Sequence, residues 1–355
     1  MFTTPPPDAT LNHRTTTGIS SLPTDILESH ILTRLNGQTL ASATCASVSL
    51  SAGHHNYQLW SNICHSTWPS TAGDRVSKII STFSDGKNGP RSFFSQSFPL
   101  PTSEPTTVSP SPQHPISLPP ASEFISAVDI YYRNKPILTK TKETETISDW
   151  FRCSQFRIDM LDPKDVIRTQ IPQPTGEATC TALMEEMTLS WILIDPVNKR
   201  SVNLSSHKPV SVHRHWLSGE VRVCYVSILG GGGGVVVQCV IVVNCGGSEE
   251  GEMQVREVTM EVEDVDGKHL KGRDSLVILQ KIMEGKRGSG VHRVEEGRRR
   301  YMMFEEMKKE RRERKSRISS FSTCFAPHTM YMFRTTWRQG QNGTSIEQEV
   351  VRATP

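Results

Sequence analysis

Two apolar runs, EVRVCYVSIL (220–229) and VVVQCVIVVN (235–244), determine the fold class of this chain. In the first run, apolar and polar residues alternate, as expected for a strand with one buried face. The second run is almost continuously apolar, which is typical of a strand covered on both faces. The five glycines between the runs predict a hairpin loop, because the Lys-Ser/Thr that a phosphate-binding loop requires does not follow them.

Further β-rich runs lie on both sides of this pair, between residues 121 and 284. Turn residues separate them, and few helical patterns lie between them. Together the runs predict a mostly antiparallel β domain, either a sandwich or a partly open barrel. The other predicted strands are EFISAVDIYY (123–132), WFRCSQFRIDM (150–160), TLSWILID (188–195), EMQVREVTMEVE (252–263) and SLVILQKI (275–282).

Residues 19–68 have a helical pattern instead. In LPTDILESHILTRL (22–35), Pro23 and Asp25 mark a helix start, and apolar residues then recur at helical spacing until Asn36-Gly37. A bundle of three short helices buries little apolar surface on its own. We therefore expect part of its apolar face to contact another protein. The second and third predicted helices span residues 39–48 and 57–64.

The remaining segments are polar, proline-rich or basic. Residues 101–120 hold seven prolines and predict a solvated linker. Residues 298–317 hold ten Lys/Arg and four Glu, whereas the whole chain has a net charge of only +3. The sequence thus predicts an α+β chain of two domains, with a disordered leader (1–18), a helical domain (19–68), a mixed segment (69–100), the linker (101–120), a β-rich domain (121–284) and a basic helix with a disordered tail (285–355).

Several classes of protein do not fit the sequence. No apolar run is long enough to span a membrane, and the first 20 residues have no apolar core of a signal peptide. The eight cysteines are scattered and are expected to be reduced thiols. No nucleophile, base or carboxylate pair lies in a known catalytic context. We therefore predict no catalytic residue and no cofactor.

A zinc site could be drawn from two histidines and two cysteines of the β-rich domain. Structural zinc sites usually use tight local ligand pairs on turns, and both cysteines lie in or beside an apolar strand. We therefore predict no metal site. The four residues are His213, His215, Cys239 and Cys245.

The helical segment resembles an F-box. The matching residues are Leu22-Pro23-x-Asp25-Ile26-Leu27, Ile31-Leu32-x-Arg34-Leu35, Leu40, Cys45-Ala46-Ser47 and Leu59-Trp60. One extra residue lies between Leu27 and Ile31 compared with the family pattern, but the spacing still keeps Leu27, Ile31 and Leu35 on one helical face.

This resemblance implies a partner for the apolar face. The partner is the Skp-type adaptor, and through it the cullin, of an SCF E3 ubiquitin ligase, bound in the helix-in-groove mode. An F-box protein of this kind is a non-catalytic receptor that presents a target protein for ubiquitination, and the sequence does not identify the target. The residues expected to bind the adaptor are Leu22, Pro23, Ile26, Leu27, Ile31, Leu32, Leu35 and Leu40, with Trp60 closing the bundle.

Stretches beyond the F-box resemble one subgroup of plant F-box proteins whose C-terminal half is uncharacterised. In addition, Trp191 followed by residues 251–280 is similar to the end of a phloem-lectin-type β-sandwich. The alternative function is therefore a non-catalytic binding protein outside SCF, with a glycan-binding β domain or a basic nuclear tail. The subgroup stretches are 63–76, 91–99, 190–196, 209–221 (PVSVHRHWLSGEV) and 251–258.

The basic segment has two interpretations. Glu and Lys/Arg at i,i+4 spacing predict a solvated helix, with a narrow apolar stripe of Tyr301, Phe304 and Met307. Alternatively, the segment is a nuclear-import patch. Few aromatic residues interleave the charges, which disfavours nucleic-acid binding by base stacking. We expect the protein in the nucleus, the cytoplasm or both. The residues of the patch are Arg311, Arg312, Arg314, Lys315 and Arg317.

Overall fold

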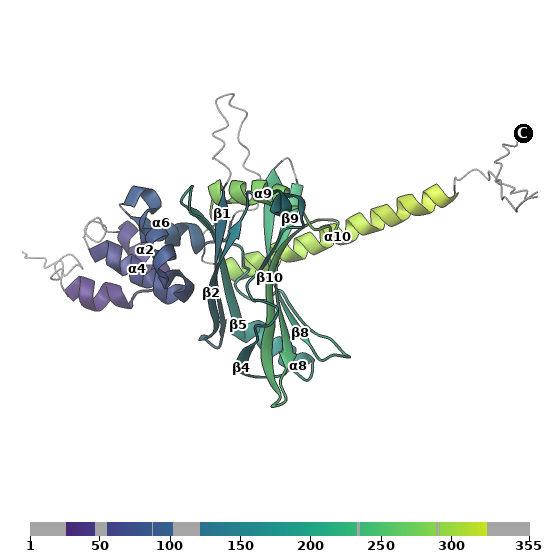
Figure 1. Ribbon diagram of the computed structural model, residues 1–355, viewed down its shortest axis with the longest axis horizontal. Coiled ribbons are helices and arrows are strands. Elements are labelled where there is room, and N and C mark those ends of the chain that lie inside the picture. The colour runs from purple at the N-terminus through teal and green to yellow at the C-terminus, as the bar shows by residue number, and fades with distance from the viewer. Residues whose placement is uncertain are drawn as a thin grey trace, which may run out of the picture. The chain divides into compact units, whose positions relative to one another are not determined.

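The computed structural model (Figure 1) confirms an α+β chain in which short helices precede an antiparallel β-rich part. The predicted leader, nearly all of the predicted linker, and Leu22 and Pro23 lie outside the described residues. The chain divides into two compact units, residues 1–307 and residues 308–355, and each is described by itself. The described residues are 26–46, 55–86, 88–101, 121–232, 235–288, 290 and 292–324.

The first helical segment is not the regular α-helix that the sequence predicts. It consists of a π-turn, η2 (Leu27–Ile31), followed by a 3-10 turn, η3 (Leu32–Arg34). The N–H of Leu32 donates to the carbonyl oxygen of Leu27, five residues earlier. A π-turn holds one residue more than an α-helical turn.

The other helices of the N-terminal part follow in quick succession. The side-chain oxygen of Asn36 accepts from the N–H of Thr39 at 2.8 Å and caps the second helix, as asparagine often does. These elements are α2 (Gly37–Ala46), α4 (His55–Thr67), η4 (Pro69–Ala72), α5 (Asp74–Ser81), η5 (Phe83–Gly86) and α6 (Gly89–Ser97).

The strands form two antiparallel sheets. Sheet 1 has the order β2-β1-β5-β6, and sheet 2 has the order β3-β10-β9-β8-β7, with β4 also paired to β10. Strands β8 and β9 pair with each other up to Gly232 and Val235, which confirms the predicted hairpin. The strands are β1 (Glu123–Tyr132), β2 (Lys135–Glu145), β3 (Arg157–Asp159), β4 (Ile167–Pro172), β5 (Met187–Asp195), β6 (Arg200–Asn203), β7 (Ser211–Arg214), β8 (Val221–Gly232), β9 (Val235–Gly247) and β10 (Glu252–Asp264).

The main core lies between the two sheets. Val221, Val223 and Tyr225 of β8 point into it, as their alternation predicts, and sheet 1 contributes Val128 and Trp191. The opposite face of β8 and β9 packs against Tyr301 and Phe304 of α10 (Arg293–Cys324). Strand β9 is thus covered on both faces, which its continuous apolar run predicts.

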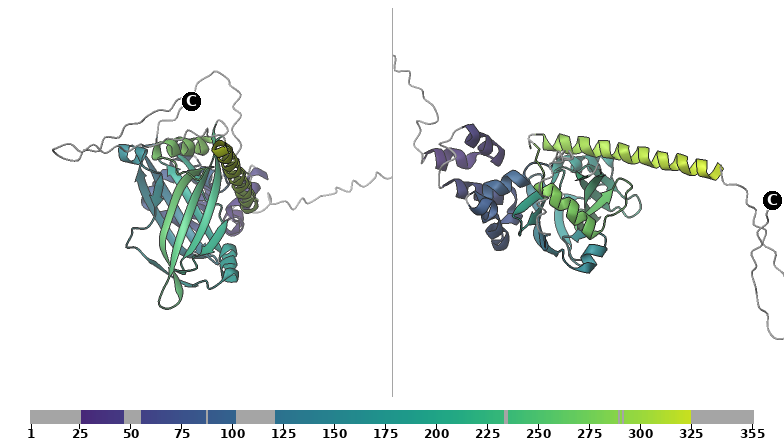
Figure 2. Two further views of the ribbon diagram at one scale, coloured as in Figure 1. Left: turned by 90° about the vertical axis from the view of Figure 1, so that its right-hand side faces the viewer. Right: turned by 90° about the horizontal axis from the view of Figure 1, so that it is seen from above.

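The short helices cover the outer face of sheet 1 (Figure 2). A second core forms there between the helices and four residues of β1 and β5: Ile125, Ala127, Ile192 and Ile194. In the next row of the sheet, Trp68 Nε1 donates to Ser190 Oγ at 3.2 Å. The helical part and the β-rich part therefore share a core.

Two of the predicted strands are wrong. Residues 275–282 lie in a helix, α9 (Gly272–Glu284), which extends across one end of the two sheets (Figure 1). Its buried residues Leu276, Leu279, Ile282 and Met283 recur at helical spacing, and a short apolar run alone does not distinguish a helix from a strand.

The strand predicted at residues 150–160 is wrong over its first part and right only near its end. They form a short helix, α7 (Asp149–Cys153), and then the three residues of β3. Ser148 caps α7, because its hydroxyl accepts from the N–H of Phe151 at 3.3 Å. The sequence analysis also did not predict strand β2, whose Lys, Thr and Glu residues are polar because it is an edge strand, or the helix α8 (Glu177–Glu186).

Helix α10 crosses the boundary between the two compact units. In the first unit, Phe304 is buried and Tyr301 half-buried, whereas Met307, the third residue of the predicted stripe, is exposed. No described helix combines the length and the apolar character that crossing a bilayer requires.

Candidate functional site

The apolar residues predicted to bind the adaptor divide into two groups in the structure. Leu32 and Leu40 are buried in the core beneath the helices, and Leu27 and Leu35 are half-buried against it. Ile26 and Ile31, in contrast, are 45% and 38% exposed.

Trp60 is part of the protein's own core. It is 2% exposed, and its ring lies 5.3 Å from that of Phe94 on α6, at a tilt of 52°. Phe94 also packs on Trp68 at 5.3 Å and on Phe98 at 5.0 Å. This aromatic cluster packs α4 against α6, and α6 in turn lies on sheet 1.

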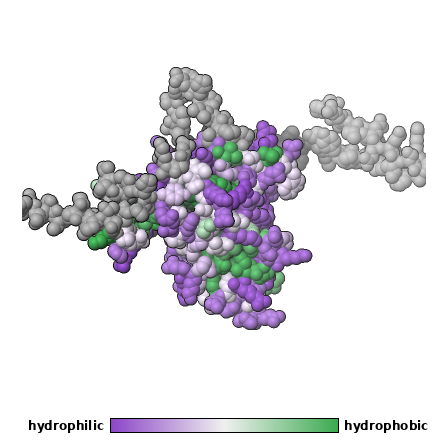
Figure 3. Space-filling view, turned by 60° about the vertical axis from the view of Figure 1, so that its left-hand side comes forward, coloured by the Kyte–Doolittle hydropathy of each residue, from purple (hydrophilic) through white to green (hydrophobic). Residues whose placement is uncertain are grey.

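The exposed pair Ile26 and Ile31 is therefore the candidate protein-binding surface of the N-terminal part. On the side of the molecule that Figure 3 displays, the surface is mostly polar, with apolar residues gathered over the β-rich part and in a smaller area at the N-terminal helices.

The predicted basic patch lies on α10 in the second compact unit, and all five of its residues are exposed. Arg314 and Glu310 form an ion pair at 3.0 Å, and Arg317 and Glu313 form one at 3.8 Å, each at i,i+4 spacing. These pairs have the geometry expected of a solvated helix. Nuclear import by the patch stays a prediction.

The residues considered for a zinc site do not come together. Cys239 and Cys245 point into the core between the sheets, whereas His213 lies on the outer face of sheet 2 and is exposed. Burial raises the pKa of the Cys239 thiol above its ordinary value and that of Cys245 to about 12. Both groups are therefore protonated at neutral pH, which makes them poor metal ligands and poor nucleophiles.

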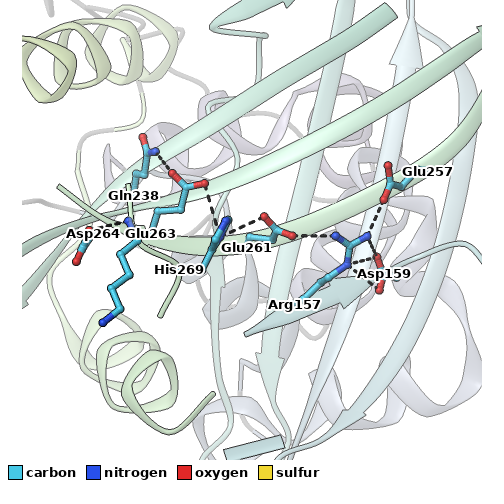
Figure 4. Close-up of polar contacts among 9 residues, drawn as sticks. Arg157, Asp159, Gln238, Glu257, Glu261, Glu263, Asp264 and His269 are labelled. Carbon is cyan, nitrogen blue, oxygen red and sulfur yellow. Dashed lines mark hydrogen bonds and ion pairs between the residues drawn. The ribbon is translucent and has the colours of Figure 1, made fainter. Parts of the chain in front are cut away.

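A different polar group lies on the outer face of β10 (Figure 4). Arg157 of β3 binds Asp159 at 2.7 Å, Glu257 at 2.6 Å and Glu261 at 2.9 Å. The hydrogen bonds that Arg157 donates to Asp159 and Glu257 raise its pKa, and the charge of Glu261 adds to the shift. On the other side of Glu261, His269 Nδ1 lies 3.4 Å from its carboxylate. We call this group the β10 cluster; its residues are Arg157, Asp159, Glu257, Glu261, Glu263 and His269.

Three residues of the β10 cluster could ligate a metal ion. The ligand atoms of Glu261, Glu263 and His269 all lie within 4.8 Å of one another. Each carboxylate already has a partner, however, because Glu261 is bound by Arg157 at 2.9 Å and Glu263 accepts from Gln238 Nε2 at 2.7 Å. The contacts are those of an ion-pair network that fastens β3 and the segment before α9 to β10.

The sequence analysis missed the β10 cluster. The alternation Glu261-x-Glu263 within EMQVREVTMEVE was a signal that both carboxylates share a face. Arg157 was not predicted to contact these carboxylates, because residues 150–160 were assigned to one long strand. The turn at Asp266-Gly267 reverses the chain and places His269 opposite Glu263. Gly267 has a φ of +77° in this turn.

A loop between β7 and β8 carries the most exposed tryptophan among the described residues. Trp216 is 82% exposed and its neighbour Leu217 is 74% exposed. Both lie within PVSVHRHWLSGEV, one of the stretches that mark the plant subgroup. The sequence analysis did not predict a binding role for them.

Comparison with known proteins identifies relatives that match most of the chain. The chain is 46% identical over 304 residues to a probable F-box protein of Arabidopsis thaliana, and the match covers 85% of this chain and 86% of the relative. Two further F-box proteins of Arabidopsis thaliana are each 41% identical to 84% of this chain, which spans 83% and 89% of their lengths. No family model and no solved structure matches the chain.

Proposed function

This chain belongs to the F-box protein family of plants, and from that premise we propose that it is the target-binding subunit of an SCF-type E3 ubiquitin ligase. In this proposal, the N-terminal helices bind a Skp-type adaptor and, through it, the cullin. The β-rich part binds a target protein. The chain contributes no catalytic group of its own.

The exposure of Ile26 and Ile31 supports the proposed adaptor surface. Both side chains lie on the first helical segment at 45% and 38% exposure, while Leu32 of the same segment is only 6% exposed. The buried residue fixes the segment to the protein, and the exposed residues remain for a partner. An amphipathic segment of this kind can place its exposed apolar residues in a groove.

The proposed mechanism is proximity. A receptor that holds its target near the ubiquitin carrier of a ligase raises the effective concentration of the reacting groups. The shared core between the helices and sheet 1 supports this mechanism, because it fixes the position of the β-rich part relative to the adaptor surface. A target bound by the β-rich part would then be held at a defined place.

The adaptor surface can be tested by a pull-down with purified Skp-type adaptor. We expect Ile26→Asp with Ile31→Asp to abolish adaptor binding without lowering the thermal stability of the chain, because both side chains are exposed. Leu32→Ala is the matched control from the same segment. It should lower stability by about 2–5 kcal/mol, the usual cost of truncating a buried leucine, and it tests whether stability alone affects binding.

Two results would overturn the proposal: failure of the wild-type chain to bind adaptor, or full binding by the double aspartate variant.

We also propose that the basic patch directs the protein to the nucleus. Replacing Arg311, Arg312 and Arg314 by Gln should then move a fluorescent fusion to the cytoplasm, whereas replacing the exposed Arg273 should not. If the fusion with the three substitutions stayed in the nucleus, the patch would not be a nuclear-import signal.

A further inference from the structure

The loop between β7 and β8 presents an apolar pair at one end of the β-rich part. We call residues 214–219 of this loop the recognition tip. Trp216 is 82% and Leu217 74% exposed there. The tip lies at the end of sheet 2 opposite α9, since β8 begins next to it at Val221 and pairs with the end of β9 at Cys245 (Figure 1).

Hydrogen bonds hold the recognition tip in one conformation. The N–H of His215 donates to the carbonyl oxygen of Glu220 at 2.7 Å, and the N–H of Gly219 donates to that of His215 at 2.9 Å. Gly219 has a φ of +70°, which the turn requires and which glycine adopts without strain. The apolar pair is therefore displayed by a closed turn.

The tip is also fastened to a neighbouring segment. Gln173, just after β4, donates from Nε2 to the carbonyl oxygen of Gly219 at 2.7 Å. Within the turn, the N–H of Ser218 donates to Nδ1 of His215 at 3.1 Å. A tip that is preformed in this way loses little conformational entropy when it binds.

Several charged side chains lie beside the tip. Three of them are arginines, Arg214, Arg222 and Arg256, and Glu220 is 3.7 Å from Arg256. Arg222 pairs with His213 across β8 and β7, so both lie on the outer face of sheet 2 next to the tip. Glu249 and Glu250 belong to the neighbouring hairpin between β9 and β10, in which the carbonyl oxygen of Gly251 accepts from the N–H of Gln173 at 2.9 Å.

We propose that the recognition tip is the part of this chain that captures the target protein, and that the target offers an apolar pocket flanked by Asp or Glu side chains. The inference rests on the proposed function and gives the target-binding part a location. Trp216 and Leu217 fill the pocket, and the arginines contact its acidic rim. Exposed tryptophans with flanking arginines are the residue types that dominate the energetics of protein interfaces.

A protein pocket explains the tip better than a lipid surface does. A bilayer accepts apolar side chains in many orientations and does not require a closed, fastened turn. The tip also offers only two large apolar residues, and stable membrane anchoring generally needs more than one signal. Charge complementarity with an acidic rim favours fast and selective binding to a protein.

The experiment starts with photo-crosslinking from the tip of the full chain in plant cells. Leu217 is replaced by benzoylphenylalanine, and adducts are purified through a tag on this chain. The control places the same group at Trp150, which is 79% exposed on α7. We expect an adduct from the tip that is absent from position 150, with the crosslink on an apolar segment of a protein next to Asp or Glu.

The crosslinked protein is then purified and its binding to the full chain is measured. We expect Trp216→Ala and Arg222→Glu each to weaken binding by about tenfold or more, as loss of an interface anchor does. Trp150→Ala and Arg273→Glu are the matched controls and should change the affinity by less than about twofold. Adaptor binding is measured on the same variants and should be unchanged.

Several outcomes would overturn the inference. They are the same adducts from both positions, no adduct from the tip, equal affinities of the tip variants and the wild type, or a tip that binds phosphatidylserine vesicles and no protein. The adaptor pull-down is a separate measurement. Loss of adaptor binding by the wild type would contradict the proposed function, whereas a negative crosslinking result with intact adaptor binding contradicts only the tip.

Discussion

At the scale of single residues, Gly37 shows how closely the N-terminal helices meet. It is the first residue of α2, and a methyl group at its Cα would lie 2.2 Å from the ring of Phe94. That ring cannot move aside easily, because Trp60, Trp68 and Phe98 all pack against it. The sequence analysis placed Gly37 at a helix end, whereas its main role is the close approach of α2 to α6.

Gly37→Ala should therefore destabilise the protein. We expect a loss of about 1–3 kcal/mol in the free energy of unfolding, the usual cost of overpacking a core, measured by urea denaturation of the full chain. Gly73→Ala is the matched control, because a methyl group there would meet nothing within 4 Å. Equal losses of unfolding free energy for the two substitutions would show that the contact with Phe94 is not the cause of the destabilisation.

His207 makes the stability of the protein depend on pH. Its Nδ1 is buried and has no hydrogen-bond partner, and burial together with Arg293 and Lys208 lowers the pKa of the imidazole to about 3. In the unfolded chain the pKa is about 6.5. Below that pH the unfolded state binds a proton that the folded state does not, so stability falls as the pH falls.

Replacing His207 by Asn should reduce this dependence. Asparagine does not titrate, and it tolerates the φ of +69° at this position. Between about pH 6.5 and pH 5, the wild type should lose up to about 1.4 kcal/mol of stability per pH unit more than the variant does. Denaturation curves at several pH values measure the difference, and parallel curves for both proteins would refute the role of His207.

At the scale of elements, Arg287 fastens three of them together. It follows α9, and its guanidinium donates to the carbonyl oxygen of Gln96 on α6 at 2.8 Å and to that of Ser201 on β6 at 2.9 Å. It also donates to three carbonyl oxygens at the end of α9, those of Ile282, Met283 and Gly285. Burial lowers its pKa to about 10, so it stays charged at neutral pH.

Arg287→Met should cost more stability than an ordinary substitution. Each buried carbonyl group that loses its donor costs about 1–3 kcal/mol. Arg287→Lys retains the charge but offers only three donors in place of five, so we expect an intermediate loss. The exposed Arg273→Met is the control and should be nearly neutral. Thermal denaturation ranks the variants, and the same midpoint for Arg287→Met and Arg273→Met would contradict the role of Arg287.

At the scale of the whole molecule, the shared core joins the helices to sheet 1. Asp129 on that face is fully buried and accepts from the N–H of Ser70 at 3.0 Å and from its hydroxyl at 2.5 Å. Burial raises the pKa of Asp129, and the two hydrogen bonds from Ser70 partly oppose the shift. Apolar and polar contacts thus both connect the two parts.

Cutting the chain between the two parts should therefore leave them associated. If a protease site is inserted near residue 110 and cleaved, we expect the fragments to elute together in size-exclusion chromatography. The control carries Ile192→Asp with Ile194→Asp, which places charges in the shared core and should let the fragments separate. Separation of the wild-type fragments would mean that the linker alone holds the two parts together.

The sequence by itself determined the local features of this protein. Periodicity gave the α+β class, the β8–β9 hairpin, the buried face of β8 and the order of helices before strands, because these depend on neighbours in the chain. The residues of the F-box pattern gave the family, which the relatives confirm. The short run 275–282 was misassigned, since its apolar residues fit a strand and a helix equally well until the packing of α9 is known.

Only the tertiary structure decided what depends on distant residues. The first helical segment folds as a π-turn and a 3-10 turn, in which Ile31 is exposed and Leu32 is buried in the core beneath the helices. Arg157 contacts β10 from a strand that lies 104 residues before Glu261 in the sequence. The helices cover the apolar outer face of sheet 1, a contact that joins segments on either side of the predicted linker and that no local pattern in the sequence could show.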